Sequence, residues 1–295
     1  MGSKSEEEGG IGFGAFDFQA LPEGCIANIL SFTTPRDACR LSLVSKIFRS
    51  AAESDAVWDQ FLPSDYQSII SRSSSSLLAT SSKKDLYFCL CDNPIIIDDG
   101  KKSFQLDRWS GKKCFMLAAR DLYIIWGQTP IYWSWPSLPE SRFAEVAKLN
   151  DVCWLEIRGK IKISMLSSAT RYAAYLVFKM IDAIGFDHHP AEVSVGILGV
   201  SSTKSVCLDP DIEERARQHF QIIPWRYRAV GSRNLLELER PKERSDGWLE
   251  IELGEFFSLG QENDEVDMSV TEIKGGNWKS GLTVQGIEIR PKEDN

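Results

Sequence analysis

The chain has 295 residues, 43% hydrophobic and 26% charged, a composition typical of a globular protein that is long enough for two domains. Its formal net charge of -8 argues against non-specific binding to nucleic acid or to an anionic membrane, because both need a basic surface. No apolar run approaches the length of a membrane span and no targeting pattern is recognisable, so we expect a protein of the cytoplasm and nucleus.

Signals for three short helices follow an acidic, glycine-rich stretch, residues 1–18, that we expect to be disordered. Pro22 favours a helix start, Thr34 before Pro35 favours a second, and Ser54 favours a third that ends before Pro63. Each helix has apolar residues at helical spacing: Ile26, Ile29 and Leu30; Leu41, Val44 and Phe48; Trp58, Phe61 and Leu62. Because roughly forty residues are near the lower limit for a self-sufficient core, we expect a binding partner.

Residues 19–63 resemble an F-box, in the Leu21-Pro22 opening, the isoleucine-rich first helix, the Pro35-Arg36-Asp37 run and the late Trp58. Phe48 stands where many F-boxes have tryptophan. The resemblance implies that this end of the chain binds a Skp-type adaptor and, through it, the cullin of a ubiquitin ligase. The contact residues that it implies are Leu21, Pro22, Ile26, Ile29 and Leu30. The alternative is a three-helix cap that packs on the neighbouring domain.

The pattern changes after Pro63. A serine-dense run predicts a linker over residues 64–85, although Ser82 favours a short helix over residues 83–91 whose alternation also fits a strand. Residues 202–246 lack alternation and are expected to form a long, partly ordered loop. Alternating apolar residues between turn signals predict an antiparallel β-sandwich, and hence an α+β chain, with strands at 95–97, 104–108, 114–117, 122–126, 152–163, 172–180, 191–199, 247–253, 265–273 and 281–290.

Three tryptophans, Trp126, Trp133 and Trp135, lie within ten residues at a predicted hairpin. Aromatic rings beside a turn suit sugar binding, because the apolar face of a pyranose stacks on a ring while its hydroxyls need carboxylates or amides. The alternative is core packing, since alternating tryptophans in a sandwich usually face inward.

Several ordered motifs between residues 86 and 291 resemble the phloem-lectin, or Nictaba-like, family. They are W-G-x-T-P-x-Y-W-x-W at 126–135, V-C-W-L-E-I-R-G-K at 152–160, T-x-Y-x-A-Y-L-V-F-K at 170–179, D-G-W-L-E-I-E-L-G-E-F-F at 246–257 and G-L-x-V-x-G-I-E-I-R-P at 281–291. The resemblance implies a jelly-roll-like sandwich that binds N-acetylglucosamine-containing glycans through Trp126, Trp133 and Trp135, with Glu250 and Glu255 as hydroxyl acceptors. Alternation places Glu250 away from the core, and its alternative role is that of a solvated strand face.

No motif for catalysis, for a cofactor or for a metal is present, so we expect no enzyme, no cofactor and no metal site. The seven cysteines are odd in number and mostly lie in apolar runs, which favours reduced thiols. The sequence therefore predicts the substrate-recognition subunit of a ubiquitin ligase whose second domain binds a glycoprotein. Two alternatives stay open: an F-box adaptor that binds protein targets without sugar, and a nucleocytoplasmic stress lectin without a ligase role.

Overall fold

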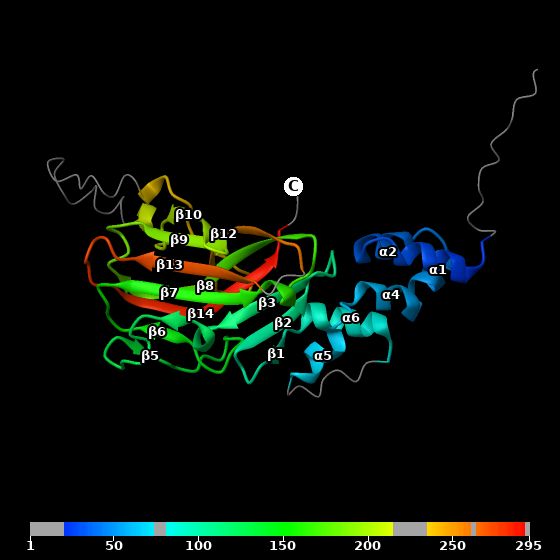
Figure 1. Cartoon of the computed structure of the whole chain (residues 1–295), viewed down its shortest axis with the longest axis horizontal. Helices are drawn as coiled ribbons and strands as arrows, with labels where there is room; N and C mark the ends of the chain where they lie inside the picture. The colour runs from blue at the N-terminus through cyan, green and yellow to red at the C-terminus, as the bar shows by residue number, and fades with distance from the viewer. Residues whose placement is uncertain (1–20, 74–80, 215–234, 261–263, 293–295) are drawn as a thin grey trace, which may run out of the picture. The chain divides into compact units, whose positions relative to one another are not determined.

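The computed structural model describes residues 21–73, 81–214, 235–260 and 264–292, and the chain divides into two compact units, residues 1–61 and 62–295 (Figure 1). The predicted disorder of residues 1–18 lies outside the described residues, as does the middle of the predicted loop 202–246. Within the described ranges, no helix is long and apolar enough to cross a lipid bilayer.

The first unit contains four short helices in its described part: α1 (Glu23–Ser31), α2 (Pro35–Leu41), α3 (Lys46–Ala52) and α4 (Asp55–Phe61). The prediction of three was wrong at the second helix. Ser45 has an extended backbone, and its hydroxyl accepts a hydrogen bond from the Phe48 amide at 3.3 Å, so Ser45 caps a new helix rather than continuing the old one. Thr34 caps α2 as predicted, accepting from the Asp37 amide at 3.1 Å.

Trp58 lies at the centre of the first unit. Its ring is fully buried, its indole N–H donates to the Ala52 carbonyl at 2.7 Å, and it meets Phe61 edge to face. Ile26 and Leu30 of α1 are also fully buried. The i, i+4 pair of the first helix therefore belongs to the unit's own core.

Two helices open the second unit. The predicted linker was wrong over its first ten residues, because α5 (Tyr66–Ser71) lies there and is anchored on both sides: Asp65 pairs with Lys113 at 3.1 Å and Arg72 with Asp98 at 2.6 Å. The short helix over 83–91 is confirmed as α6 (Lys83–Asp92), with the Ser82 hydroxyl accepting from the Asp85 amide.

Two antiparallel sheets form the rest of the second unit (Figure 1), which confirms the α+β class and the antiparallel sandwich. In the described residues the larger sheet has the order β1-β2-β3-β14-β8-β12-β11, with β6 added at β14 and β5 at β6, and the smaller has the order β10-β9-β13-β7-β4. The larger sheet comprises β1 (Ile95–Ile97), β2 (Lys102–Leu106), β3 (Lys113–Ala118), β5 (Trp133–Ser134), β6 (Ala147–Leu149), β8 (Thr170–Ile184), β11 (Lys242–Glu243), β12 (Leu249–Ser258) and β14 (Ser280–Pro291). The smaller comprises β4 (Tyr123–Ile124), β7 (Leu155–Lys162), β9 (Ala191–Ile197), β10 (Val200–Val206) and β13 (Glu265–Glu272).

The predicted strands correspond to ten of these, and β5, β6, β10 and β11 were missed. Strand β10 runs into the predicted loop 202–246, where its polar residues hide the alternation: VSSTKSV is exposed at most positions. The loop prediction is therefore wrong at its beginning.

The core lies between the two sheets. Gly159 of β7 identifies the inner faces, because a Cβ placed there would meet the side chains of Leu122, Leu117 and Ile287 at 3.0–3.2 Å. Leu117 and Ile287 belong to the larger sheet, and Ile287 pairs with Leu176 of β8. These residues are buried, so both sheets direct their alternate apolar side chains into one shared layer.

The outer faces of the two sheets differ. On the larger sheet, Met116, Ala118 and Val177 point outward and are buried under Phe143, Val146 and Trp248; we call this the covered face. On the smaller sheet, Glu156, Arg158, Lys160, Asp267 and Ser269 point outward and stay exposed or half-buried; we call this the open face.

Candidate functional site

The predicted hairpin is wrong, because β4 pairs with β7 in the smaller sheet whereas β5 pairs with β6 in the larger. The three tryptophans of residues 126–135, which we call the tryptophan segment, have three different environments. Trp126 is 40% exposed, has a positive φ of 54°, and its ring lies 5.2 Å from that of Tyr132. Trp133 is 1% exposed and donates its indole N–H to the Ile125 carbonyl at 3.1 Å. Trp135 is half-buried, donates to the Gly127 carbonyl at 2.9 Å, and has the Arg120 guanidinium 3.7 Å above its ring.

These environments correct part of the predicted sugar site. Trp133 cannot stack on a ligand, because its ring is enclosed by the protein. Trp135 is occupied on one face by Arg120. Of the three predicted rings, Trp126 is the one whose exposure suits stacking.

Glu250 points to the covered face, as alternation predicted, but it is already engaged. Its carboxylate accepts from Arg290 at 2.6 Å and from Arg244 at 2.8 Å. Burial opposes its ionisation, yet the Arg290 and Arg244 guanidiniums prevail and hold the pKa of Glu250 below its ordinary value. Glu250 is therefore not a free acceptor for sugar hydroxyls, which corrects its predicted role.

Glu255 lies further along β12 and is more exposed than Glu250. It pairs with Lys292 and, at 3.6 Å, with Arg171. The hydrogen bond from Lys292 holds the pKa of Glu255 below its usual range, so the carboxylate is ionised at neutral pH. Trp126 lies in the turn after β4, whereas Glu250 and Glu255 lie on β12 of the larger sheet.

Glu288 occupies the centre of the charge cluster on the covered face. One oxygen accepts from Arg142 at 3.3 Å, and the other accepts from Arg244 at 2.7 Å and Arg290 at 2.9 Å. Its side chain is 3% exposed. Burial disfavours the charged form, but the surrounding arginines, Arg244 and Arg142 first, hold the pKa of Glu288 below its ordinary value. This cluster is a saturated ion network with a structural role.

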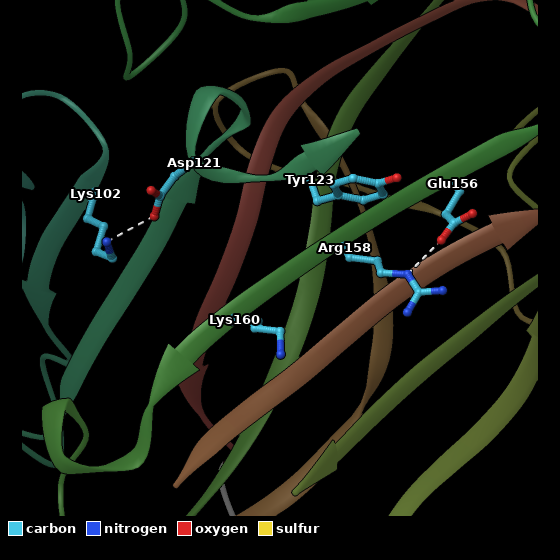
Figure 2. Close-up of a pocket in the computed structure, with 6 residues that line it drawn as sticks. All are labelled: Lys102, Asp121, Tyr123, Glu156, Arg158 and Lys160. Atoms are coloured by element: carbon cyan, nitrogen blue, oxygen red, sulfur yellow. Dashed lines mark hydrogen bonds and ion pairs between the residues drawn. The ribbon is translucent and has the colours of Figure 1, made fainter. Parts of the chain in front are cut away.

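A polar pocket of ≈ 740 Å³ opens at the β4 edge of the open face (Figure 2). Lys102 and Asp121 line one side, and Tyr123, Glu156 and Arg158 line the other, with Lys160 between them. This pocket was not predicted from the sequence, although the V-C-W-L-E-I-R-G-K motif contains three of its residues. Alternation along that motif was the available signal, since it places Glu156, Arg158 and Lys160 on one outward face.

The first unit presents a second candidate surface. Among residues 21–61, the exposed large apolar side chains are Ile29, Phe32, Leu43 and Val44, of which Phe32 is 84% and Leu43 76% exposed. Pro22 is exposed and Leu21 half-buried. Among the predicted adaptor contacts, Ile26 and Leu30 are corrected, because both are 0% exposed. Phe32 and Leu43 were missed, and Val44 was assigned to a helix face that the turn before Ser45 removes.

The remaining candidate groups are metal ligands and cysteine thiols. Across residues 21–73, 81–214, 235–260 and 264–292, no group of three His, Cys, Asp or Glu could hold a metal ion. All seven cysteines are free. Burial raises the pKa of the Cys207 thiol to about 11, so this thiol stays protonated and unreactive at neutral pH.

Two family models match this chain, each over a different part of it. Residues 112–291 match the family model of phloem protein 2, and residues 18–60 match that of the F-box domain. The F-box protein At2g02240 of Arabidopsis thaliana is 50% identical over 94% of this chain and 81% of its own length. The F-box protein PP2-B10 of the same plant is 49% identical over 93% of this chain and 94% of its own length. The chain therefore belongs to the phloem protein 2 family and carries an F-box ahead of its phloem-lectin-like domain.

Proposed function

We propose that this chain is the substrate-recognition subunit of an SCF-type cullin-RING ubiquitin ligase. In this proposal the F-box binds a Skp-type adaptor and, through it, the cullin, while the phloem-lectin-like domain binds a glycoprotein or an N-acetylglucosamine-containing glycan. The chain acts without catalysis of its own, since holding a target near the ubiquitin-charged enzyme accelerates transfer by proximity. It works in the cytoplasm and nucleus, without a cofactor, a nucleic acid or a membrane as partner.

The observation that carries the adaptor half is the apolar surface of the first unit. Phe32, Leu43 and Val44 are each more than half exposed, and Ile29 of α1 is 44% exposed. A unit this small would not keep four large apolar side chains in water without a partner that covers them. The fully buried Ile26 and Leu30 support this surface from within and do not belong to it.

An adaptor-binding measurement on the full chain tests this half. We expect Phe32→Asp and Leu43→Asp each to weaken binding of purified Skp-type adaptor at least tenfold, because each places a charge in the contact. Leu198→Asp is the matched control, since Leu198 is 74% exposed in the second unit. Unchanged adaptor affinity in both F-box variants would exclude this surface as the contact.

The glycan half is carried by Trp126, whose exposed ring lies beside Tyr132. Stacking of a pyranose on such a ring contributes apolar contact area without requiring the ring to move. Titration of chitotriose into the full chain tests it by calorimetry. Trp126→Ala should reduce affinity at least tenfold, whereas Trp278→Ala, which removes another exposed tryptophan, should not. A wild-type chain that binds no glycan would favour the alternative in which the domain recognises a protein surface.

A further inference from the structure

We propose that the open face carries a second carbohydrate subsite, built by Tyr123, Trp154, Glu156 and Arg158 and selective for neutral oligosaccharides. This inference rests on the proposed glycan-binding function and adds a surface to it. The subsite differs from the tryptophan segment, because it uses outward residues of β7, Trp154 in the bend before it, and the edge strand β4.

Position along the strand brings these side chains together. Glu156 and Arg158 are two residues apart on β7, so they project from the same face. Trp154 lies in the bend just before β7, and the hydrogen bond from its indole places it beside Glu156. Tyr123 lies directly opposite Arg158 in the antiparallel pairing of β4 with β7. Tyr123 is 57% exposed and Trp154 42%, so two aromatic rings flank an acid and a guanidinium on a rigid sheet.

Hydrogen bonds hold the acid in one orientation. One oxygen of Glu156 accepts from the Trp154 indole at 3.0 Å, and the other accepts from the Arg158 Nε at 2.7 Å. These bonds, the one from Trp154 first, hold the pKa of Glu156 below its usual range. The outer Arg158 nitrogens and the Tyr123 hydroxyl have no hydrogen-bond partner among the described residues, so they are available to a ligand.

The charges of the pocket favour a neutral ligand. Lys102 pairs with Asp121 at 2.9 Å, Arg158 with Glu156 at 2.7 Å and Lys160 with Asp267 at 2.8 Å. Because each cation is matched by an acid, a phosphate or a uronate would meet as much repulsion as attraction. Donors and acceptors set side by side instead suit hydroxyl groups, each of which both donates and accepts.

Size and location are consistent with an oligosaccharide. The volume of ≈ 740 Å³ falls within the range of small-molecule sites, and the pocket is lined on one side by the Tyr123 ring (Figure 2). Trp126 follows Tyr123 by three residues, which limits the distance between their Cα atoms to about 11 Å. A ligand of several sugar rings could therefore contact both the open face and the Trp126 side chain.

The test compares chitotriose, chitohexaose and trigalacturonate by calorimetry on the full chain. We expect Tyr123→Ala and Arg158→Ala each to weaken chitohexaose binding about tenfold, with a smaller effect on chitotriose. Lys162→Ala is the matched control, because Lys162 also points outward from β7 but does not line the pocket, and it should change neither affinity. All three side chains are exposed or on the sheet surface, so an unchanged thermal midpoint should accompany each variant.

The outcomes separate this inference from the proposed function. If Trp126→Ala abolishes binding while Tyr123→Ala and Arg158→Ala bind chitohexaose like the wild type, the second subsite is refuted and glycan binding stands. If trigalacturonate binds more tightly than the neutral sugars, the selectivity argued from paired charges is wrong. A wild-type chain that binds none of the three overturns both.

Discussion

The tripeptide Glu-Ile-Arg occurs on two strands of the sandwich and has opposite surroundings in each. On β14 it is Glu288 to Arg290, and on β7 it is Glu156 to Arg158; in both, alternation sends the acid and the arginine to an outer face. Glu288 is 3% exposed and bonds three arginines, whereas Glu156 is 14% exposed and bonds one arginine, Arg158, which is itself 58% exposed. The same local sequence gives a buried network in one place and a solvent-facing pair in the other.

The difference comes from what lies above each sheet. Trp248, Phe143 and Val146 cover the larger sheet, so the charges beside them lose water and must satisfy one another. The Trp248 indole donates to the Glu140 carbonyl at 3.2 Å, which ties this cover to the segment between β5 and β6. On the open face, the Arg158 side chain is 58% exposed and keeps its hydration. Its unused donors are therefore free to serve a ligand.

The largest expected loss of stability follows from replacing Glu288, the acid at the centre of the ion network on the covered face. Glu288→Gln leaves Arg142, Arg244 and Arg290 with one neutral partner in place of a carboxylate, so we expect the free energy of unfolding to fall by about 3–5 kcal/mol. Urea denaturation of the full chain, followed by tryptophan fluorescence, measures it. Glu156→Gln is the matched control in the second tripeptide and should cost under about 1 kcal/mol, as exposed pairs do. Equal losses in the two variants would contradict the contrast between the faces.

Trp133 and Trp126 allow the same comparison between an enclosed and a more exposed position within the tryptophan segment. Trp133→Ala should lower the free energy of unfolding by about 3–4 kcal/mol, because it leaves a cavity and an unpaired Ile125 carbonyl. Trp126→Ala should cost less, about 1 kcal/mol, since Trp126 is already 40% exposed. Thermal unfolding by circular dichroism gives both values. A larger loss in Trp126→Ala than in Trp133→Ala would mean that the burial of the two rings is misassigned.

The sandwich and the limits of most strands could be predicted from the sequence, because alternation and turn residues are local signals. The sequence could not place the covered face. Glu250 and Glu156 have the same outward alternation, yet Glu250 meets two arginines and Glu156 one. The difference depends on the cover that residues 136–146 provide, and those residues have no regular pattern of their own. Spacing likewise cannot rank Ile26, Ile29 and Leu30 on one helix stripe, although two are core and one is surface.

Arg244 tests how far the network on the covered face can compensate. It bridges Glu288 at 2.7 Å and Glu250 at 2.8 Å, and it also pairs with Asp246. Arg244→Met should lower the free energy of unfolding by about 1–3 kcal/mol, less than Glu288→Gln, because Arg290 still contacts both acids. A double-mutant cycle with Glu288→Gln measures the coupling. Simple additivity would show that the two groups do not act as one network.

Lowering the pH should reduce the stability that the ion network of the covered face contributes. The arginines hold the pKa values of Glu288 and Glu250 below their ordinary values, so the stability that they contribute is complete above the pKa of an unfolded glutamate, about 4.3, and is lost as pH falls through the lower folded values. The stability of the wild type should therefore fall between pH 5 and pH 3, as carboxylates on the covered face take up protons.

Glu288→Gln has lost one of these titrating groups, so the difference in stability between this variant and the wild type should narrow over the same range. Glu156→Gln should show the same narrowing on a smaller scale, because the pKa of Glu156 is also lowered but its partner Arg158 is 58% exposed and screened by solvent. Urea midpoints measured in steps across this range decide the matter: a gap that stays constant down to pH 3 would mean that Glu288 does not titrate as a member of the arginine network.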